Sequence, residues 1–280
     1  MEVGVGLPAG IPGVEGHEIA DWARRAEAGP FASLAAIDRL AYDCYEPLVA
    51  LAAAAAVTRR LLLATTILIG PLRNTALLAK QLASLDRLSG GRLVVGLGLG
   101  ARLDDYEAAG VPHTGRGQRL SEQLVDIPEL LERTERHAVP RLLTGGMSGP
   151  ALARMARYSS GYIHGGGPPR VFRRAAEEAR AAWIDAGRPG VPEVWGQAYF
   201  AFGDDGRGAD YVRDYYAFTG AFADKVAAGL LTTPRQAVEL IRAYAEAGCD
   251  HLVLLPAVPG AGQLEQLGEV VAEALETVPR

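Results

Sequence analysis

Glycines and small polar residues, more than acids and bases, occupy the positions in this sequence where chemistry is expected. The run Gly96-Leu97-Gly98-Leu99-Gly100 ends an apolar stretch, and Gly145-Gly146-Met147-Ser148 precedes a segment typical of a helix. Because glycine has no Cβ, a ligand can approach the backbone closely at such positions. Backbone N–H groups at the start of a helix also bind anions such as phosphate. Both segments are therefore candidates for a ligand-binding surface.

Few titratable residues are expected near these glycines. Asp38 and His164 each follow an apolar stretch and are our candidates for an acid or base, although His164 also suits a polar strand end. Ser148 lies in Gly-Gly-Met-Ser-Gly-Pro, which lacks the Gly-x-Ser-x-Gly pattern of a hydrolase nucleophile. Helix capping and phosphate contact are two compatible roles for Ser148. The histidines are scattered and predict no metal site: His17, His113, His137, His164 and His251.

The elements that must position these residues alternate between strand and helix. Short apolar runs predict strands at 3–7, 33–37, 61–69, 93–97, 141–144, 162–164, 194–202 and 251–255. Helical periodicity predicts helices at 17–28, 47–57, 118–131, 150–158, 171–186, 209–228, 234–247 and 263–277, together with a leucine-rich helix that ends at Gly90. Residues 102–117 are expected to form a loop.

Eight strands alternating with helices predict a single α/β barrel, of the TIM-barrel type, that spans residues 1–280 as one domain with loop insertions at the strand carboxyl ends. Active sites of such barrels lie at those carboxyl ends. The predicted mouth therefore gathers a mainly uncharged set of residues: Asp38, Thr65, Thr66, Gly98, Gly100, Gly145, Gly146, His164 and Gly165.

Two other interpretations of the strand-four glycines remain open at this stage. Gly96, Gly98 and Ala101 fit the loose Gly-x-Gly-x-x-Gly/Ala dinucleotide pattern, but that pattern needs a helix that opens at the glycines. Residues 101–110 resemble a loop or one short turn, in which we expect Asp104 and Asp105 to be solvated. The glycines could instead serve packing alone.

The segment from Ser89 to Gly100, Ser-Gly-Gly-Arg-Leu-Val-Val-Gly-Leu-Gly-Leu-Gly, resembles the signature of the bacterial luciferase-like family. The resemblance covers most of the chain, through Leu72-Arg73-Asn74, Gly145-Gly146-Met147-Ser148 and Ala247-Gly248-Cys249-Asp250. One departure is Ser160-Gly161-Tyr162, where the family usually has Asp-Gly-Trp. The connection at 132–140 is also shorter than the insertion that is usual in this family.

This resemblance implies a TIM-barrel monooxygenase that takes reduced FMN from a separate reductase and uses oxygen to oxidise a small apolar or aromatic substrate. The alternatives are hydride transfer with a deazaflavin coenzyme and flavin binding without catalysis. The end of strand three would lie against the flavin ring, where family members often hold a strained peptide bond, and Arg73 and Asn74 would lie near the cofactor, unless Asn74 only caps a helix. The implied cofactor-binding residues are Thr65, Thr66, Ile67, Gly98, Gly100, Gly145, Gly146, Met147, Ser148, Gly165 and Gly166.

Composition limits the partners. A net charge of −5 without a basic block argues against nucleic acid, and the longest apolar helical segment, 47–57, is shorter than a bilayer span of about 20 residues. The amino terminus has no signal-peptide pattern, so we expect a cytoplasmic protein with reduced Cys44 and Cys249. The alanine-rich helix and the leucine-rich helix after it favour a homodimer. Aromatic candidates for the substrate pocket are Tyr42, Tyr45, Tyr106, Tyr199 and Phe202.

Overall fold

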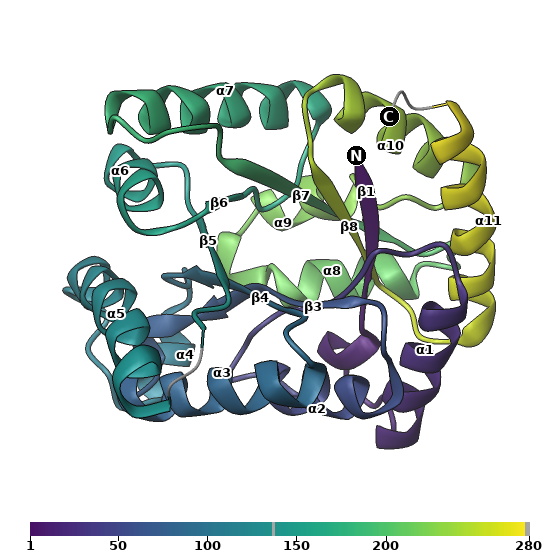
Figure 1. The fold of residues 1–280 in the computed structure, drawn as a ribbon. Coiled ribbons are helices and arrows are strands. Elements are labelled where there is room, and N and C mark those ends of the chain that lie inside the picture. The colour runs from purple at the N-terminus through teal and green to yellow at the C-terminus, as the bar shows by residue number, and fades with distance from the viewer. Residues whose placement is uncertain (136–137, 278–280) are drawn as a thin grey trace.

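Eight parallel strands close into one barrel in chain order, as the sequence predicts. The computed structural model describes residues 1–135 and 138–277 of the chain. In Figure 1 the helices surround these strands. The strands are β1 (Glu2–Gly6), β2 (Ser33–Ala36), β3 (Leu62–Ile69), β4 (Leu93–Gly98), β5 (Arg141–Gly145), β6 (Gly161–Ile163), β7 (Glu193–Phe200) and β8 (His251–Pro256).

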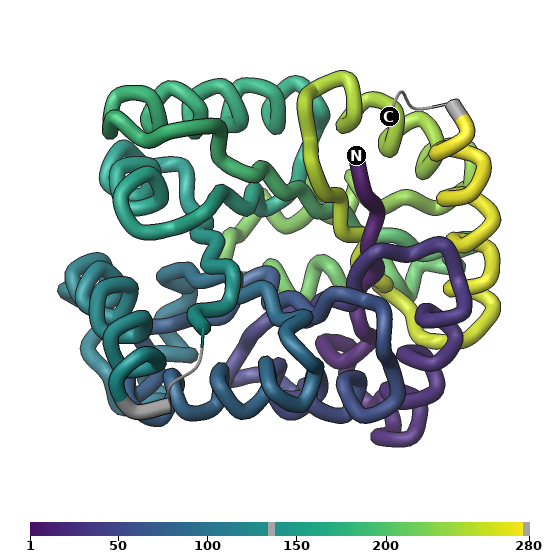
Figure 2. Tube along the Cα trace, viewed as in Figure 1, coloured from purple at the N-terminus to yellow at the C-terminus, as the bar shows by residue number. Residues whose placement is uncertain are grey.

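Helices follow the strands, and most of their bounds lie within two residues of the prediction. The helices are α1 (Gly16–Ala28), α2 (Pro47–Val57), α3 (Thr75–Ser89), α4 (Leu103–Ala108), α5 (Arg116–Leu130), α6 (Gly149–Tyr158), α7 (Pro169–Asp185), α8 (Arg207–Tyr215), α9 (Phe222–Ala227), α10 (Pro234–Glu246) and α11 (Ala261–Thr277). The tube in Figure 2 follows the same alternation around the barrel. Short helical turns occur at Pro8–Gly10, Gly70–Leu72, Leu131–Glu135 and Ala217–Thr219.

Helix α4 lies inside the segment that the sequence predicts to be a loop. Its side chain Tyr106 is buried, and the Tyr106 hydroxyl donates a hydrogen bond to the carbonyl of Leu99. Asp104 and Asp105 in the first turn also suit the positive end of the helix dipole. A buried aromatic residue and two acidic residues therefore turn a polar, glycine-bounded segment into a short helix.

The helix expected at 209–228 is broken into α8, the turn Ala217–Thr219 and α9. The break contains Gly220, whose φ of 60° lies in the left-handed region that favours glycine. Helix α8 contacts the turn Pro8–Gly10 that follows β1, because the hydroxyl of Tyr211 donates to the carbonyl of Gly10 at 3.0 Å. The break therefore lets this segment fold over the barrel mouth.

A buried polar cluster fills the opposite end of the barrel. The Nε2 of His251 lies 2.8 Å from the hydroxyl of Ser33, and its ring stacks on Trp195 at 3.9 Å. Gly4 leaves the necessary space, since a Cβ there would lie 2.0 Å from the Ser33 hydroxyl. The Nδ1 of His251 lies 3.3 Å from the carboxylate of Glu2.

We predict that this contact makes a small pH-dependent contribution to stability. The hydrogen bond from His251 lowers the pKa of Glu2 below its ordinary value of 4.5. A carboxyl with a lowered pKa stabilises the fold above the ordinary value, and this stabilisation is lost as the pH falls through the lowered pKa. When melting temperatures are measured from pH 7 to pH 3, the wild type should therefore melt higher than Glu2→Gln near pH 7, and the difference should disappear near pH 3. An equal difference at every pH would contradict the prediction.

Candidate functional site

A cavity of about 450 Å³ lies at the carboxyl ends of the strands, where the barrel fold predicts the site. Its walls come from the ends of β2, β3, β4, β5 and β7 and from Gly165 in the turn after β6. Helices α4, α5 and α6 and the segment that ends α8 complete them. Two parts of its lining differ in composition. One is rich in glycine and is called the glycine-rich end below, and the other is rich in aromatic side chains.

The glycine-rich end contains five of the residues that the sequence singles out: Gly100, Gly145, Gly146, Ser148 and Gly165 line the cavity. A Cβ added to Gly165 would meet no atom within 4 Å, so the missing side chain leaves open space. Gly146 has a φ of 119°, and Gly166, which does not line the cavity, has a φ of 99°. Met147 points outward and is 64% exposed.

Ser148 is the N-cap of α6, as the capping interpretation predicts. Its hydroxyl accepts a hydrogen bond from the backbone N–H of Ala151 at 3.3 Å. A hydroxyl that accepts in this way still has a proton to donate. Helix capping and phosphate contact therefore remain compatible for Ser148.

Arg116, the first residue of α5, is a cavity residue that the sequence reasoning missed. Its Nη1 lies 2.8 Å from Nδ1 of His113, and its buried Nε has no hydrogen-bond partner in the described part of the chain. Across those same residues Arg116 pairs with no carboxylate. A guanidinium without a carboxylate partner, in the same cavity as the N-cap of α6, suits a bound anion.

The end of β3 also reaches the cavity. Thr66 and Ile67 line it, and the peptide bond between them is cis. The hydroxyl of Thr66 and the Oε1 of Gln197 on β7 are buried, and neither has a partner within residues 1–135 and 138–277. Buried polar atoms are ordinarily hydrogen-bonded, so these two are candidates for contact with a ligand. Thr65 points elsewhere, because its hydroxyl donates to the carbonyl of Gly96.

Gly98 lies behind Ile67 and does not line the cavity. A Cβ on Gly98 would lie 1.9 Å from Cδ1 of Ile67, so the glycine makes room for the side chain that borders the cavity. Gly98 therefore affects the cavity indirectly, because it allows Ile67 to occupy its place in the cavity wall.

Replacing Gly98 with valine should lower stability by about 1–3 kcal/mol through overpacking against Ile67. The companion change Ile67→Ala should recover part of the lost melting temperature in the double variant, although Ile67→Ala alone should lower it. Thermal melts of the four proteins check this coupling. Simple additivity of the two changes would contradict the proposed contact.

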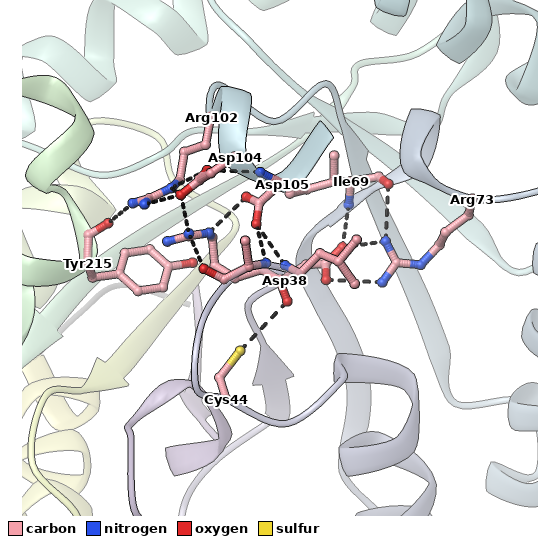
Figure 3. A network of polar contacts seen from close by, with 11 residues as sticks. Asp38, Cys44, Ile69, Arg73, Arg102, Asp104, Asp105 and Tyr215 are labelled. Atoms are coloured by element: carbon pink, nitrogen blue, oxygen red, sulfur yellow. Dashed lines mark hydrogen bonds and ion pairs between the residues drawn. The ribbon is translucent and has the colours of Figure 1, made fainter. Parts of the chain in front are cut away.

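Asp38 lines the cavity but is held by protein groups. Arg73 donates to both Asp38 oxygens, at 2.6 and 3.0 Å, and the N–H of Ile69 donates at 2.7 Å (Figure 3). Burial raises the pKa of Asp38, and the Arg73 guanidinium opposes that rise. Asp38 therefore ties β2 to the end of β3. Asn74 is the N-cap of α3.

Asp105 corrects the expectation that Asp104 and Asp105 are solvated. The Asp105 carboxylate is fully buried and accepts from Arg39 at 2.8 Å and from the N–H groups of Leu40 and Ala41 (Figure 3). Asp104 is 42% exposed and pairs with Arg102 at 2.6 Å. Asp105 is buried because it pairs with Arg39, whose guanidinium is also buried and would otherwise lack a close counter-charge.

His164 is buried beside the cavity without lining it. Its Nδ1 accepts from the N–H of Gly166 at 3.2 Å, while its Nε2 has no partner among the residues described. Burial lowers the pKa of His164, which keeps the ring neutral. The observed contact fits the polar strand-end role and fixes the turn after β6.

Of the five aromatic residues proposed for the pocket, Tyr199 lines it. The others serve elsewhere, for example Tyr42, whose hydroxyl donates to Asp214, and Tyr45, whose hydroxyl donates to the carbonyl of Val14. The remaining aromatic wall comes from Tyr215, Tyr216 and Phe218, at the break in the predicted helix. A sequence pattern interpreted as one continuous helix gave no signal for this wall.

Comparison with known proteins decides the family. Residues 1–229 match the family described as luciferase-like monooxygenase. The chain belongs to the luciferase-like monooxygenase family. The predicted resemblance and the barrel fold are therefore both confirmed.

Sequence relatives of this luciferase-like protein include uncharacterised mycobacterial proteins. One from Mycobacterium tuberculosis is 33% identical over 168 residues, which cover 53% of this chain and 58% of the relative. The match thus spans little more than half of that relative's length. A second protein of the same organism is 43% identical over 79 residues, which cover 28% of each chain.

Solved structures share the fold at low identity. An F420-dependent secondary alcohol dehydrogenase in complex with an F420-acetone adduct has a TM-score of 0.82 and 16% identity, covering 98% of both chains. The monooxygenase RslO1 from Streptomyces bottropensis has a TM-score of 0.76 and 22% identity, covering 100% of this chain and 99% of the other. The 3,6-diketocamphane monooxygenase component from Pseudomonas putida, in complex with FMN, has a TM-score of 0.72 and 17% identity, covering 98% of both.

The described part of this luciferase-like barrel offers neither a metal-binding cluster nor a membrane-spanning helix. Within the described residues no group of three or more His, Cys, Asp or Glu side chains is arranged to hold a metal ion. No described helix combines the length and apolarity needed to cross a membrane. His137 and part of the connection 132–140 lie outside the described residues.

Proposed function

We propose that this protein is a flavin-dependent monooxygenase that takes reduced FMN from a separate reductase and uses oxygen to oxidise a small organic substrate. The observation that carries the proposal is the glycine-rich end of the cavity, where Ser148 at the start of α6 and the carboxylate-free Arg116 line one surface. A helix N-terminus and an arginine together suit a phosphate group. The FMN bound to one structural relative is consistent with this choice.

The residues present fit a flavin in three respects. The open space over Gly165 suits a flat ring, the unpartnered Thr66 hydroxyl offers a polar contact, and Arg116 with Ser148 offers donors to a phosphate. When bound, the flavin supplies the redox chemistry, and the protein supplies position and exclusion of water. This division of labour agrees with a cavity in which Asp38 and Asp105 are both held by arginines.

The test is an anaerobic titration with reduced FMN, reduced riboflavin and a reduced deazaflavin coenzyme. We expect FMN to bind at least tenfold more tightly than riboflavin, because each charge-assisted bond to the phosphate contributes about 1.5–3 kcal/mol. Oxygen uptake after substrate addition then reports turnover. Tighter binding of the deazaflavin would favour hydride transfer instead, as in the F420-dependent relative. FMN binding without any turnover would favour a non-catalytic homologue.

We also propose that the protein forms a homodimer through α2 and α3. Val49 and Leu77, in the first turns of these neighbouring helices, are 64% and 58% exposed. Light scattering should give twice the chain mass of 29.6 kDa, and Val49→Asp with Leu77→Asp should shift it to one chain mass, because a buried unpaired charge opposes association. A wild-type monomer at micromolar concentration would contradict this proposal.

A further inference from the structure

Aromatic rings form a second part of the cavity lining. We use the name aromatic wall for Tyr199, Tyr215, Tyr216 and Phe218, all of which line the cavity. Their rings contact one another, with centroids of Tyr215 and Tyr216 separated by 5.2 Å and those of Tyr216 and Phe218 by 6.4 Å. Packed aromatic rings favour a flat aromatic ligand, which can pack against them edge-to-face or offset.

The charges in this part of the lining cancel one another. Arg39 pairs with Asp105 at 2.8 Å, and Arg102 pairs with Asp104 at 2.6 Å (Figure 3). Arg102 also lies over the ring of Phe218. Each of these two arginines is thus committed to a carboxylate. An anionic ligand would lose its hydration and approach these carboxylates as well, so an uncharged ligand is favoured.

Polar atoms in this part of the lining nevertheless lack partners. The Nη1 of Arg39 and the Oε1 of Gln197 are buried, both residues line the cavity, and neither atom is hydrogen-bonded to any described residue. The first is a donor and the second is an acceptor. The Tyr199 and Tyr216 hydroxyls, 3.4 Å apart, add a further weakly engaged pair. A ligand oxygen that can both accept and donate matches this set.

We propose that the aromatic wall binds an uncharged aromatic compound that carries a hydroxyl or carbonyl oxygen, and that Arg39 Nη1 donates to this oxygen. A hydroxyl can in addition donate to Gln197 Oε1. The inference rests on the proposed function in one respect, namely that the flavin occupies the glycine-rich end. It goes further by naming the substrate class and the residues that select it.

Calorimetric titration of the protein with oxidised FMN bound tests the class with three bicyclic probes. Naphthol is aromatic and uncharged at pH 7, naphthoate has the same rings with a carboxylate, and decalol keeps the hydroxyl on saturated rings. We expect naphthol to bind at least tenfold more tightly than naphthoate, because the carboxylates of Asp104 and Asp105 beside the paired arginines oppose a further negative charge. Decalol should bind about threefold to tenfold more weakly than naphthol.

Two phenylalanines of one segment supply matched variants. Phe218 lines the cavity and is 43% exposed, whereas Phe222 is 57% exposed and does not line it. Phe218→Leu should weaken naphthol binding about threefold to tenfold, and Phe222→Leu should leave it within about twofold. FMN affinity should be unchanged in both variants, which shows that each is folded.

The outcomes separate this inference from the proposed function. If FMN binds but naphthoate binds as well as naphthol, or if the two leucine variants behave alike, the proposed substrate class is wrong and flavin binding stands. If FMN does not bind, the proposed function fails, and the same probes titrated into Arg116→Gln, which removes the unpaired cation from the cavity, still test the wall. If naphthoate binds more tightly than naphthol in that titration, the inference is overturned.

Discussion

Asp105→Ala should destabilise the protein by about 3–5 kcal/mol, because it leaves the buried guanidinium of Arg39 with only a 3.4 Å contact to the carboxylate of Asp104. The same change removes the acceptor of the Leu40 and Ala41 N–H groups, which hold the loop after β2. Thermal unfolding should show a fall in melting temperature of roughly 10 °C for a domain of this size.

Asp104→Ala is the matched control for this change. Asp104 precedes Asp105 in the same helix turn, but its side chain is 42% exposed and its ion pair with Arg102 is open to solvent on one side. We expect a loss of about 1 kcal/mol or less. Equal losses for the two variants would show that the burial of Asp105 does not determine its role.

The barrel itself could be predicted because each of its elements carries a local signal. Runs such as 93–97 read as buried strands, and Pro47, Gly90 and Ser148 mark helix ends where the structure places them. The family signature then located the glycine-rich end of the cavity. These features depend on residues that are neighbours in the sequence.

The ion pairs and the aromatic wall depend on residues far apart in the sequence, and local patterns could not find them. Arg39 and Asp105 are separated by 66 positions, so an adjacent pair of aspartates appeared solvated. Tyr216 and Phe218 lie at a break that helical periodicity does not mark. The sequence placed Gly98 against a ligand, whereas in the structure the side chain of Ile67 packs against Gly98. No local pattern marks this contact.

The position of the cofactor phosphate can be tested most directly at Arg116. A carboxylate at Gly146 would be a poorer probe, because its φ of 119° strains any side chain and a Cβ would lie 2.8 Å from that of Ala151. Arg116, in contrast, has no carboxylate partner in the described residues whose loss would complicate the result. Its removal therefore reports mainly on the ligand.

Arg116→Gln should raise the dissociation constant of FMN about tenfold to one hundredfold and leave that of riboflavin within about twofold. The reason is that a charge-assisted bond to the phosphate is lost while contacts to the ring remain. Arg119→Gln removes the same charge from the same helix at a residue that does not line the cavity, so FMN affinity should change little. Arg116→Lys should fall between wild type and Arg116→Gln, because it keeps the charge without the planar fork. Equal losses for FMN and riboflavin would mean that Arg116 contacts the ring or supports the fold, and the turn Gly165–Gly167 would then be the next place to test for the phosphate.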